Sequence, residues 1–180
     1  PIPADTRVLD VIENVTWTPE AEITGCTIKR IPTRGFLLTT RKKVVVSGNR
    51  FVRIHRNGIN VESDAANWFE SGCVRDMTIC DNRFEECGGE AILISPRHSV
   101  PNSSVHQNTR ITGNTFVLPE QGSAVNACGV EGLTITGNHI EMLAPIHGRT
   151  TIAVNDCDNV VIEDNELMLR ATALRAGGKR

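Results

Sequence analysis

A short sequence unit recurs along this chain, and it constrains the fold more than any other feature. In its most complete form the unit reads VVVSGNRF, with alternating apolar residues before an asparagine and another apolar residue two places after it. The asparagine recurs at positions 49, 82, 114, 138 and 165, so successive copies are 33, 32, 24 and 27 residues apart. A degenerate copy, AEITGCTI, precedes them with Cys26 at the asparagine position. Repeats of this length predict a solenoid, a propeller or another repeat array.

A second segment follows each copy and has the same period. It occurs as GFLL from Gly35, GINV from Gly58, AILI from Ala91, AVNA from Ala124 and TIAV from Thr151. Apolar residues at every second position are typical of β-strands, and Asn, Gly and Asp between the runs are typical of turns. Leucine-rich repeats would need a leucine framework and a helical or 3₁₀ return segment. Propeller blades would need about 40 residues and four strands each.

The pattern therefore predicts an all-β fold, a single-stranded parallel β-helix of the pectin-lyase-like kind with about five or six coils. Right-handedness is expected from the general rule for parallel crossovers. Like residues would stack between coils, with the apolar residues after the asparagine forming one internal column. The asparagines themselves are expected at a bend, where they would adopt left-handed dihedrals and bond the equivalent amide on the next coil.

Composition and charge limit the other interpretations. A net charge of −2, without a basic tract that contains aromatic residues, argues against a nucleic-acid partner. No apolar run reaches about 18 residues, so no membrane span is predicted. We expect one β-helix domain over residues 1–180, a fragment of a longer chain because it begins without Met, and a disordered tail at 171–180. No signal peptide is visible in this chain.

Six cysteines lack the paired spacing of a zinc site, so buried free thiols are expected, with one disulfide as the alternative.

Two long insertions follow the strands that end at Val61 and Ile94, and they carry the candidate functional residues. Because neighbouring coils stack in register, both insertions should leave the same corner and lie side by side. The first insertion contains Glu62, Asp64, Trp68 and Glu70, and the second contains Arg97, His98 and His106. We expect the asparagine column and the two histidines to be structural or surface features rather than catalytic ones.

Carboxylates beside an exposed tryptophan fit sugar chemistry. An aromatic face stacks on the C–H face of a pyranose, while one carboxylic acid protonates the leaving oxygen and another activates water or attacks carbon. Each residue also has a simpler interpretation, in which Asp64 bonds its own turn, Glu62 is solvated, Glu70 caps loop amides and Trp68 pins the loop. A polysaccharide lyase is a second enzymatic alternative, but it would need a carboxylate cluster for calcium. The outward positions of the second segment hold no carboxylate: Leu37, Asn60, Leu93, Asn126 and Ala153.

The segments TRGFLLTTRKKVVVSGNRF and GINVESDAANWFESGCVRDMTICDNRFEECG resemble the β-helix region of the α-galactosidases of glycoside hydrolase family 110, from about Pro32 to Asn114. The resemblance implies an exo-acting enzyme that removes terminal α-linked galactose with inversion, using aspartates and no metal. It aligns Asp64 with the acidic pair that precedes the W-x-ESG element. Ser63 stands where that family commonly has a second aspartate.

The sequence therefore predicts a carbohydrate-active β-helix protein, a glycoside hydrolase that uses carboxylate acid/base catalysis on an oligosaccharide or polysaccharide, without a cofactor or metal. The predicted catalytic residues are Asp64 and Glu70, and the predicted substrate-binding residues are Trp68, Arg34, Glu62 and His98. A carbohydrate substrate favours a secreted or periplasmic protein. The alternative from another class is a non-catalytic module that binds glycans or acts as a spacer.

Overall fold

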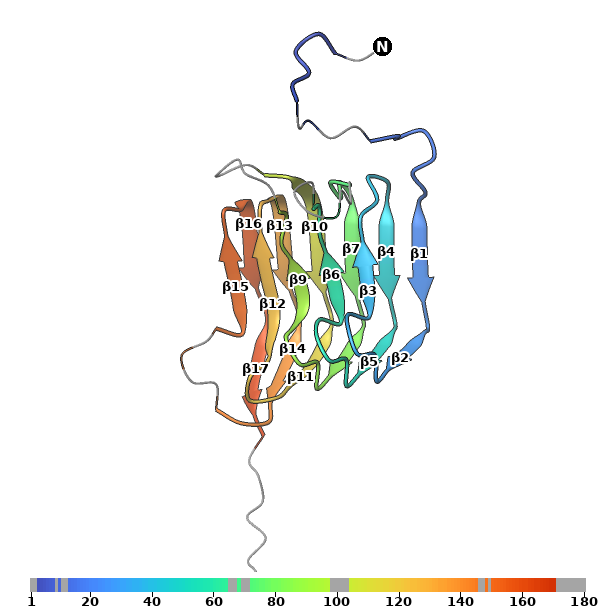
Figure 1. Cartoon of the computed structure of the whole chain (residues 1–180). Helices are drawn as coiled ribbons and strands as arrows, with labels where there is room; N and C mark the ends of the chain where they lie inside the picture. The colour runs from blue at the N-terminus through green and yellow to red at the C-terminus, as the bar shows by residue number, and fades with distance from the viewer. Residues whose placement is uncertain are drawn as a thin grey trace, which may run out of the picture.

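The chain folds into a stack of parallel β-strands. The computed structural model describes residues 3–8, 10, 13–64, 68, 72–97, 104–145, 148 and 150–170. These residues form seventeen strands in three sheets, and every strand pair is parallel (Figure 1). The predicted all-β parallel β-helix is confirmed. The described segments contain no helix of the length and apolarity that a bilayer crossing requires.

Each coil adds one strand to each sheet in turn, and the described part of the last coil contributes two. Sheet A consists of β1 (Ala21–Thr24), β4 (Val44–Ser47), β7 (Met77–Cys80), β10 (His106–Thr112), β13 (Val130–Thr136) and β16 (Asp158–Glu163). Sheet B consists of β2 (Thr27–Lys29), β5 (Arg50–Val52), β8 (Arg83–Glu85), β11 (Thr115–Leu118), β14 (His139–Met142) and β17 (Glu166–Leu169). Sheet C consists of β3 (Phe36–Leu38), β6 (Ile59–Val61), β9 (Glu90–Ile94), β12 (Ser123–Cys128) and β15 (Ile152–Asn155).

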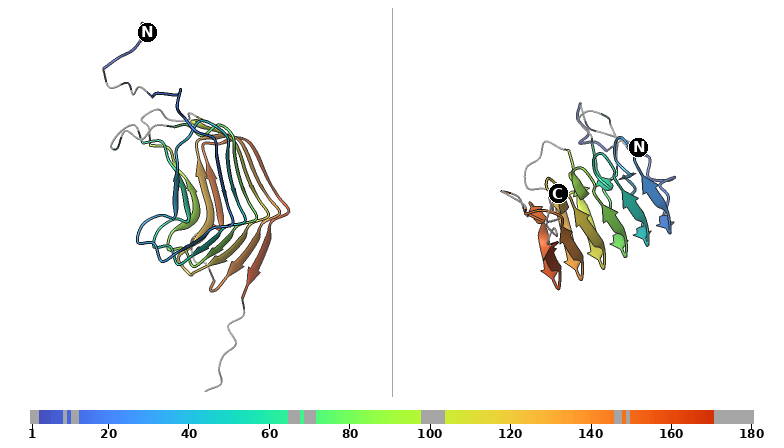
Figure 2. Two further views of the ribbon diagram at one scale, coloured as in Figure 1. Left: turned by 90° about the vertical axis from the view of Figure 1, so that its right-hand side faces the viewer. Right: turned by 90° about the horizontal axis from the view of Figure 1, so that it is seen from below.

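The register between coils follows the repeat spacing read from the sequence. Phe51 pairs with Phe84, Phe84 with Phe116, and Phe116 with Ile140, so the residue two places after each asparagine forms one internal column. The Phe51 and Phe84 rings are stacked with centroids 4.7 Å apart, and those of Phe84 and Phe116 are 5.1 Å apart. Seen along the axis of the stack, the coils superpose with the three sheets around this core (Figure 2). Each coil is therefore buried mainly by its neighbours.

The asparagines form a continuous hydrogen-bonded ladder inside the turn between sheets A and B. Asn49 Nδ2 donates to Asn82 Oδ1 at 3.0 Å, and the backbone N–H of Asn49 donates to the same oxygen at 2.9 Å. The pattern repeats from Asn82 to Asn114, from Asn114 to Asn138 and from Asn138 to Asn165. Every amide that is buried in the turn thus finds its partner on the next coil, as the repeat predicts.

The bend beside the ladder differs from the expectation in one respect. The left-handed backbone falls on the residue before each asparagine rather than on the asparagine itself. These residues have φ between 55° and 63°: Gly25, Gly48, Asp81, Gly113, Gly137 and Asp164. Glycine adopts this conformation without strain and Asp tolerates it, which leaves the asparagine free to point its amide inward. The sequence signal for the bend is therefore the Gly or Asp that precedes the asparagine.

The apolar columns lose their cover at the last coil. Val160, Ile162, Leu167 and Leu169 continue columns whose earlier members are buried, yet their side chains are 37% to 53% exposed. The C-terminal end of the described stack therefore presents an apolar face.

The six cysteines are all free in the described structure, but only Cys87 is buried, so the expectation of buried thiols holds for that residue alone. Burial raises the pKa of the Cys87 thiol to about 12. Cys26, at the asparagine position of the first coil, is exposed.

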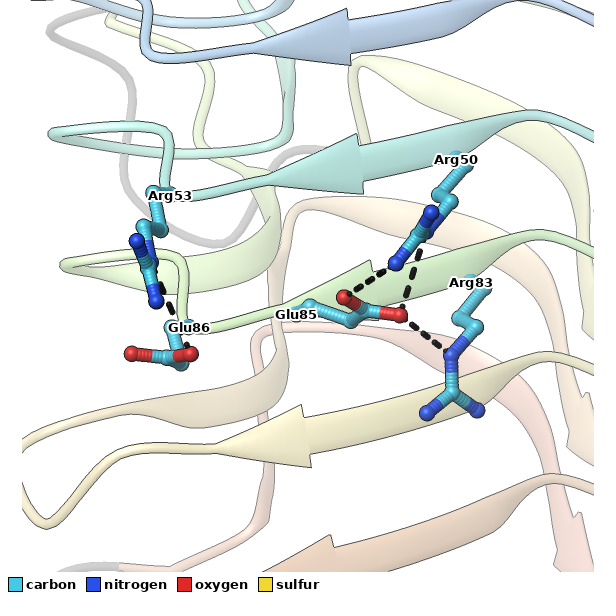
Figure 3. Close-up of polar contacts among 5 residues, drawn as sticks. All are labelled: Arg50, Arg53, Arg83, Glu85 and Glu86. Atoms are coloured by element: carbon cyan, nitrogen blue, oxygen red, sulfur yellow. Dashed lines mark hydrogen bonds and ion pairs between the residues drawn. The ribbon is translucent and has the colours of Figure 1, made fainter.

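The outer face of sheet B carries an ion-pair cluster that joins the second and third coils (Figure 3). Arg50 on β5 donates to both carboxylate oxygens of Glu85 on β8, at 3.2 and 2.9 Å, and Arg83 Nε donates to Glu85 at 2.5 Å. Beside them, Arg53 lies 3.7 Å from Glu86. The hydrogen bond from Arg50 is the main reason that the pKa of Glu85 is lowered. The cluster thus reinforces the register that the ladder sets inside.

Replacing Asn82 by alanine should destabilise the fold strongly. The change removes the acceptor of two bonds from Asn49 and the donor to Val46 O, in a site that is closed to water. We expect a loss of about 2–4 kcal/mol in the free energy of unfolding, measured with urea. The exposed Asn155 on β15 provides the control, because Asn155→Ala should change stability by less than about 0.5 kcal/mol. Equal losses in the two variants would contradict a structural role for the ladder.

The sheet B cluster should make stability depend on pH. Because the folded pKa of Glu85 is lowered, its contribution is complete above the unfolded value of about 4.3 and is lost as pH falls through the folded pKa. Glu85→Gln should therefore lower the melting temperature by about 1–3 °C at neutral pH and by progressively less in acid. Glu22→Gln, at an exposed position of β1, is the control and should show no such pH-dependent difference.

Candidate active site

The two long insertions begin side by side at the end of sheet C, as the sequence predicts. The backbone ladder between β6 and β9 continues beyond both strands, because Ser95 N–H donates to Val61 O at 3.0 Å and Arg97 N–H to Ser63 O at 2.9 Å. Asp64 and Arg97 form an isolated parallel bridge. Register alone therefore fixes which residues of the two insertions meet. We call this meeting point, formed by Asn60, Glu62, Asp64 and Arg97, the loop junction.

Two carboxylates of the loop junction face one guanidinium. Arg97 Nε lies 2.5 Å from Glu62 Oε1, and an Arg97 terminal nitrogen lies 3.9 Å from Asp64 Oδ2. Asn60 Nδ2 donates to the other Glu62 oxygen at 2.7 Å. The side chain of Arg97 is 56% exposed, whereas that of Glu62 is 8% exposed and that of Asp64 is fully buried. The arginine thus lies at the surface over two nearly buried acids.

The geometry gives the two acids different roles. A buried carboxylate is costly unless it is paired and hydrogen-bonded, and Glu62 has both a close guanidinium and an amide donor. Asp64 is too far from the guanidinium for a direct hydrogen bond. Glu62 therefore anchors Arg97, while the attraction between Arg97 and Asp64 is mainly electrostatic.

The other predicted site residues lie in different places. Trp68 is 76% exposed, as a residue that stacks on a ligand requires. Arg34 is half-buried and precedes β3, where the register aligns it with Asn57 at the beginning of sheet C. Since Asn57 is seven residues before Asp64, this places Arg34 roughly 23 Å along the strands from the junction. The structure therefore does not bring Arg34 together with Asp64. Glu70 and His98 lie outside the described residues.

Sequence reasoning placed Arg97 in the second insertion but did not pair it with Glu62. The signal was available, because a strand period of two puts Asn60, Glu62 and Asp64 on one side of the chain. His106 behaves as a structural residue: it is buried at the start of β10 and its Nδ1 accepts a hydrogen bond from Val74 N–H at 3.1 Å. Within the described ranges, no group of three or more His, Cys, Asp or Glu side chains is placed to hold a metal ion.

A hollow of about 580 Å³ lies one coil away from the loop junction, since Leu37 in its lining pairs with Asn60. It is lined by the segment that precedes the first coil, including Trp17, and by residues of β1 and β3. None of the predicted site residues that the structure describes lines it.

The repeat, the three parallel sheets and the site at the end of one sheet define a parallel β-helix protein. The family model for the right-handed β-helix region matches residues 11–138, and the chain belongs to this family. The match also confirms the predicted right-handedness.

Among curated proteins, the chain is similar to several α-1,3-galactosidases. It is 41% identical over 162 residues to α-1,3-galactosidase A of Bacteroides thetaiotaomicron, covering 88% of this chain and 28% of that protein. It is 50% identical over 125 residues to α-1,3-galactosidase A of Akkermansia muciniphila, covering 69% and 21%. It is 35% identical over 181 residues to α-1,3-galactosidase B of Bacteroides thetaiotaomicron, covering 93% and 29%.

These similarities confirm the resemblance to the β-helix region of family 110 α-galactosidases. They also extend it, because the matches reach well beyond the 32–114 range that the motifs cover. The chain spans less than a third of the length of these relatives.

Removing the Arg97 guanidinium should lower the free energy of unfolding, because burying the two acids beside it is unfavourable without a positive charge. Arg97→Met removes the guanidinium that faces Glu62 and Asp64, so we expect a loss of about 1–3 kcal/mol in unfolding free energy, measured with urea. Arg110→Met is the matched control, since its partner Asp76 is 43% exposed and can be hydrated. The control should cost less than about 1 kcal/mol. If Arg97→Met in a Glu62→Gln background costs as much as in the wild type, the two side chains are not coupled.

Proposed function

We propose that this chain is the β-helix region of a glycoside hydrolase that acts on terminal α-linked galactose. The observation that carries the proposal is the convergence of Glu62 and Asp64 on Arg97, in a chain that is 41% and 50% identical to parts of proteins named α-1,3-galactosidase. A fixed acid next to an exposed guanidinium and a nearby exposed tryptophan is a combination that suits a sugar ligand.

In the proposed reaction, Asp64 is the first catalytic carboxylate and Glu70 is the second. Glycoside hydrolysis needs one carboxyl group to protonate the leaving oxygen and another to activate water or attack the anomeric carbon. Ser63 offers no carboxylate, so the second acid comes from elsewhere in the insertion. Inversion, which the family resemblance implies, would require a separation of about 6.5–9.5 Å between the two carboxyl groups.

Arg97 and Glu62 are positioning and binding groups in this account. Glu62 and Asn60 hold the guanidinium in place, and its remaining N–H donors are available to sugar hydroxyls. A sugar hydroxyl group that binds the terminal nitrogen of Arg97 would draw this nitrogen away from Asp64. The buried acid would then be open to the substrate. Trp68 would stack on the apolar face of the sugar ring, and His98 is a further proposed contact.

A non-catalytic glycan-binding module is the second candidate, and one observation favours it. The side chain of Asp64 is fully buried, whereas a catalytic acid must reach the glycosidic bond. In this account Asp64 and Glu62 only order the insertions, while Arg97 and Trp68 bind the glycan at the surface.

Asp64→Asn separates the two candidates. If Asp64 is the catalytic acid or base, kcat/KM on an aryl α-galactoside should fall at least about 100-fold, while the melting temperature changes little. Asp76→Asn, on the outer side of the stack in an exposed pair with Arg110, is the control and should keep full activity. Progress of the reaction is followed by release of the aryl group.

Two results would point away from hydrolysis. A wild-type chain that binds galactosides but turns over none of a panel of α- and β-linked substrates would support the binding module. A variant whose activity falls only in proportion to its folded fraction would assign Asp64 a structural role.

A further inference from the structure

The outer face of sheet C contains a second hollow, separate from the loop junction. Its volume is about 340 Å³, at the lower end of the range for small-ligand sites. It is lined by residues from three consecutive coils and one turn: Glu90, Ser123, Asn126, Gly148, Thr150 and Ala153.

The coil register places two pairs of these residues side by side on neighbouring coils. Ser123 on β12 pairs with Glu90 on β9, so a hydroxyl group and a carboxylate stand next to each other at the beginning of the sheet. Three residues further along the strand, Asn126 pairs with Ala153 on β15. The small side chain of Ala153 leaves the space that a larger residue at this outward position would fill.

The carboxylate in the hollow is held in place. Asn57 Nδ2 donates to Glu90 Oε2 at 3.1 Å and to Glu90 O at 3.0 Å, which fixes both the side chain and the backbone of Glu90. Asn57 itself is buried. Holding a carboxylate in one orientation reduces the entropy that a ligand must remove on binding.

The lining selects one chemical class of ligand. A carboxylate accepts hydrogen bonds, while Ser123, Thr150 and Asn126 can each donate and accept. The carboxylate disfavours anions, and none of the described residues in the lining offers a large apolar side chain to a hydrophobic ligand. A neutral molecule with several hydroxyl groups, such as a hexopyranose, meets these requirements.

The hollow is too far from Asp64 to hold the same sugar. Asn60 is four residues before Asp64, which is roughly 13 Å along the strand, and Asn126 lies two coils from Asn60 in the same row, roughly 10 Å across the sheet. A ring bound in the hollow and a ring bound at the loop junction would be different units of one glycan.

We propose that this hollow is a distal carbohydrate subsite, which binds a neutral sugar unit several positions away from the terminal galactose. The proposal rests on the proposed function for the identity of the galactose, but the hollow itself is a binding site whether or not the chain is catalytic. Glu90, Ser123 and Asn126 are the residues that select the sugar.

Filling the hollow tests the proposal. Ala153→Trp should raise KM for an α-galactose-terminated oligosaccharide of four or more units by about tenfold or more, and leave kcat/KM for a short aryl α-galactoside unchanged. Thr134→Trp, which adds the same side chain on the outer face of sheet A, should change neither value. Asn126→Ala is the second variant and should act in the same direction without adding bulk. Equal effects on both substrates, or no effect on either, would overturn the proposal.

A direct measurement of oligosaccharide binding makes the test independent of catalysis. Titration calorimetry of the same oligosaccharide should show affinity that is lost in Ala153→Trp and weakened in Asn126→Ala. A wild-type chain without turnover that nevertheless shows this pattern would contradict the proposed hydrolase and support the subsite. A wild type that hydrolyses galactosides but whose affinity for long and short substrates is the same in all variants would support the hydrolase and contradict the subsite.

Discussion

The asparagine ladder is the interaction on which the rest of the structure depends. Each buried ladder amide donates to the asparagine of the next coil, so a coil that shifts by one residue leaves several buried donors and acceptors without partners. Packing of the stacked phenylalanines beside the ladder favours the same register. Non-directional burial would tolerate small shifts between coils, whereas the ladder does not. Hydrogen bonding therefore sets the register and apolar burial supplies most of the stability.

This fixed register is what turns two irregular insertions into a site. The insertions leave adjacent coils at the same corner, and the bridge between Asp64 and Arg97 continues the ladder of sheet C into them. The guanidinium consequently reaches Glu62 and Asp64 from a position that the strand register fixes. The same logic lines up Glu90 with Ser123 and Asn126 with Ala153 along the sheet. In both places the stacked strands fix where the side chains lie, and the polar groups of those side chains provide the contacts to a ligand.

The sequence predicted the scaffold well because its signals are local and repeated. The spacing of the asparagines gave the coil lengths, and strand alternation gave the inward columns. The bend was assigned to the asparagine because its tolerance of left-handed dihedrals is well known, but the preceding Gly or Asp takes that conformation. The site was harder, because the pairing of Glu62 with Arg97 depends on how two insertions of unrelated sequence align. Burial of Asp64 is likewise a tertiary property that no local pattern encodes. The separation of Arg34 from Asp64, in contrast, follows from the register of the repeat.

We propose the loop junction as the place where the terminal sugar binds. The most direct measurement is a crystal structure of the Asp64→Asn variant in complex with an α-1,3-linked galactoside. We predict a galactose ring against Trp68, with hydroxyl groups bonded to the Arg97 guanidinium and the glycosidic oxygen next to the residue that replaces Asp64. A galactose bound elsewhere on the stack, with no contact between Arg97 and the sugar and with residue 64 still buried, would contradict this account.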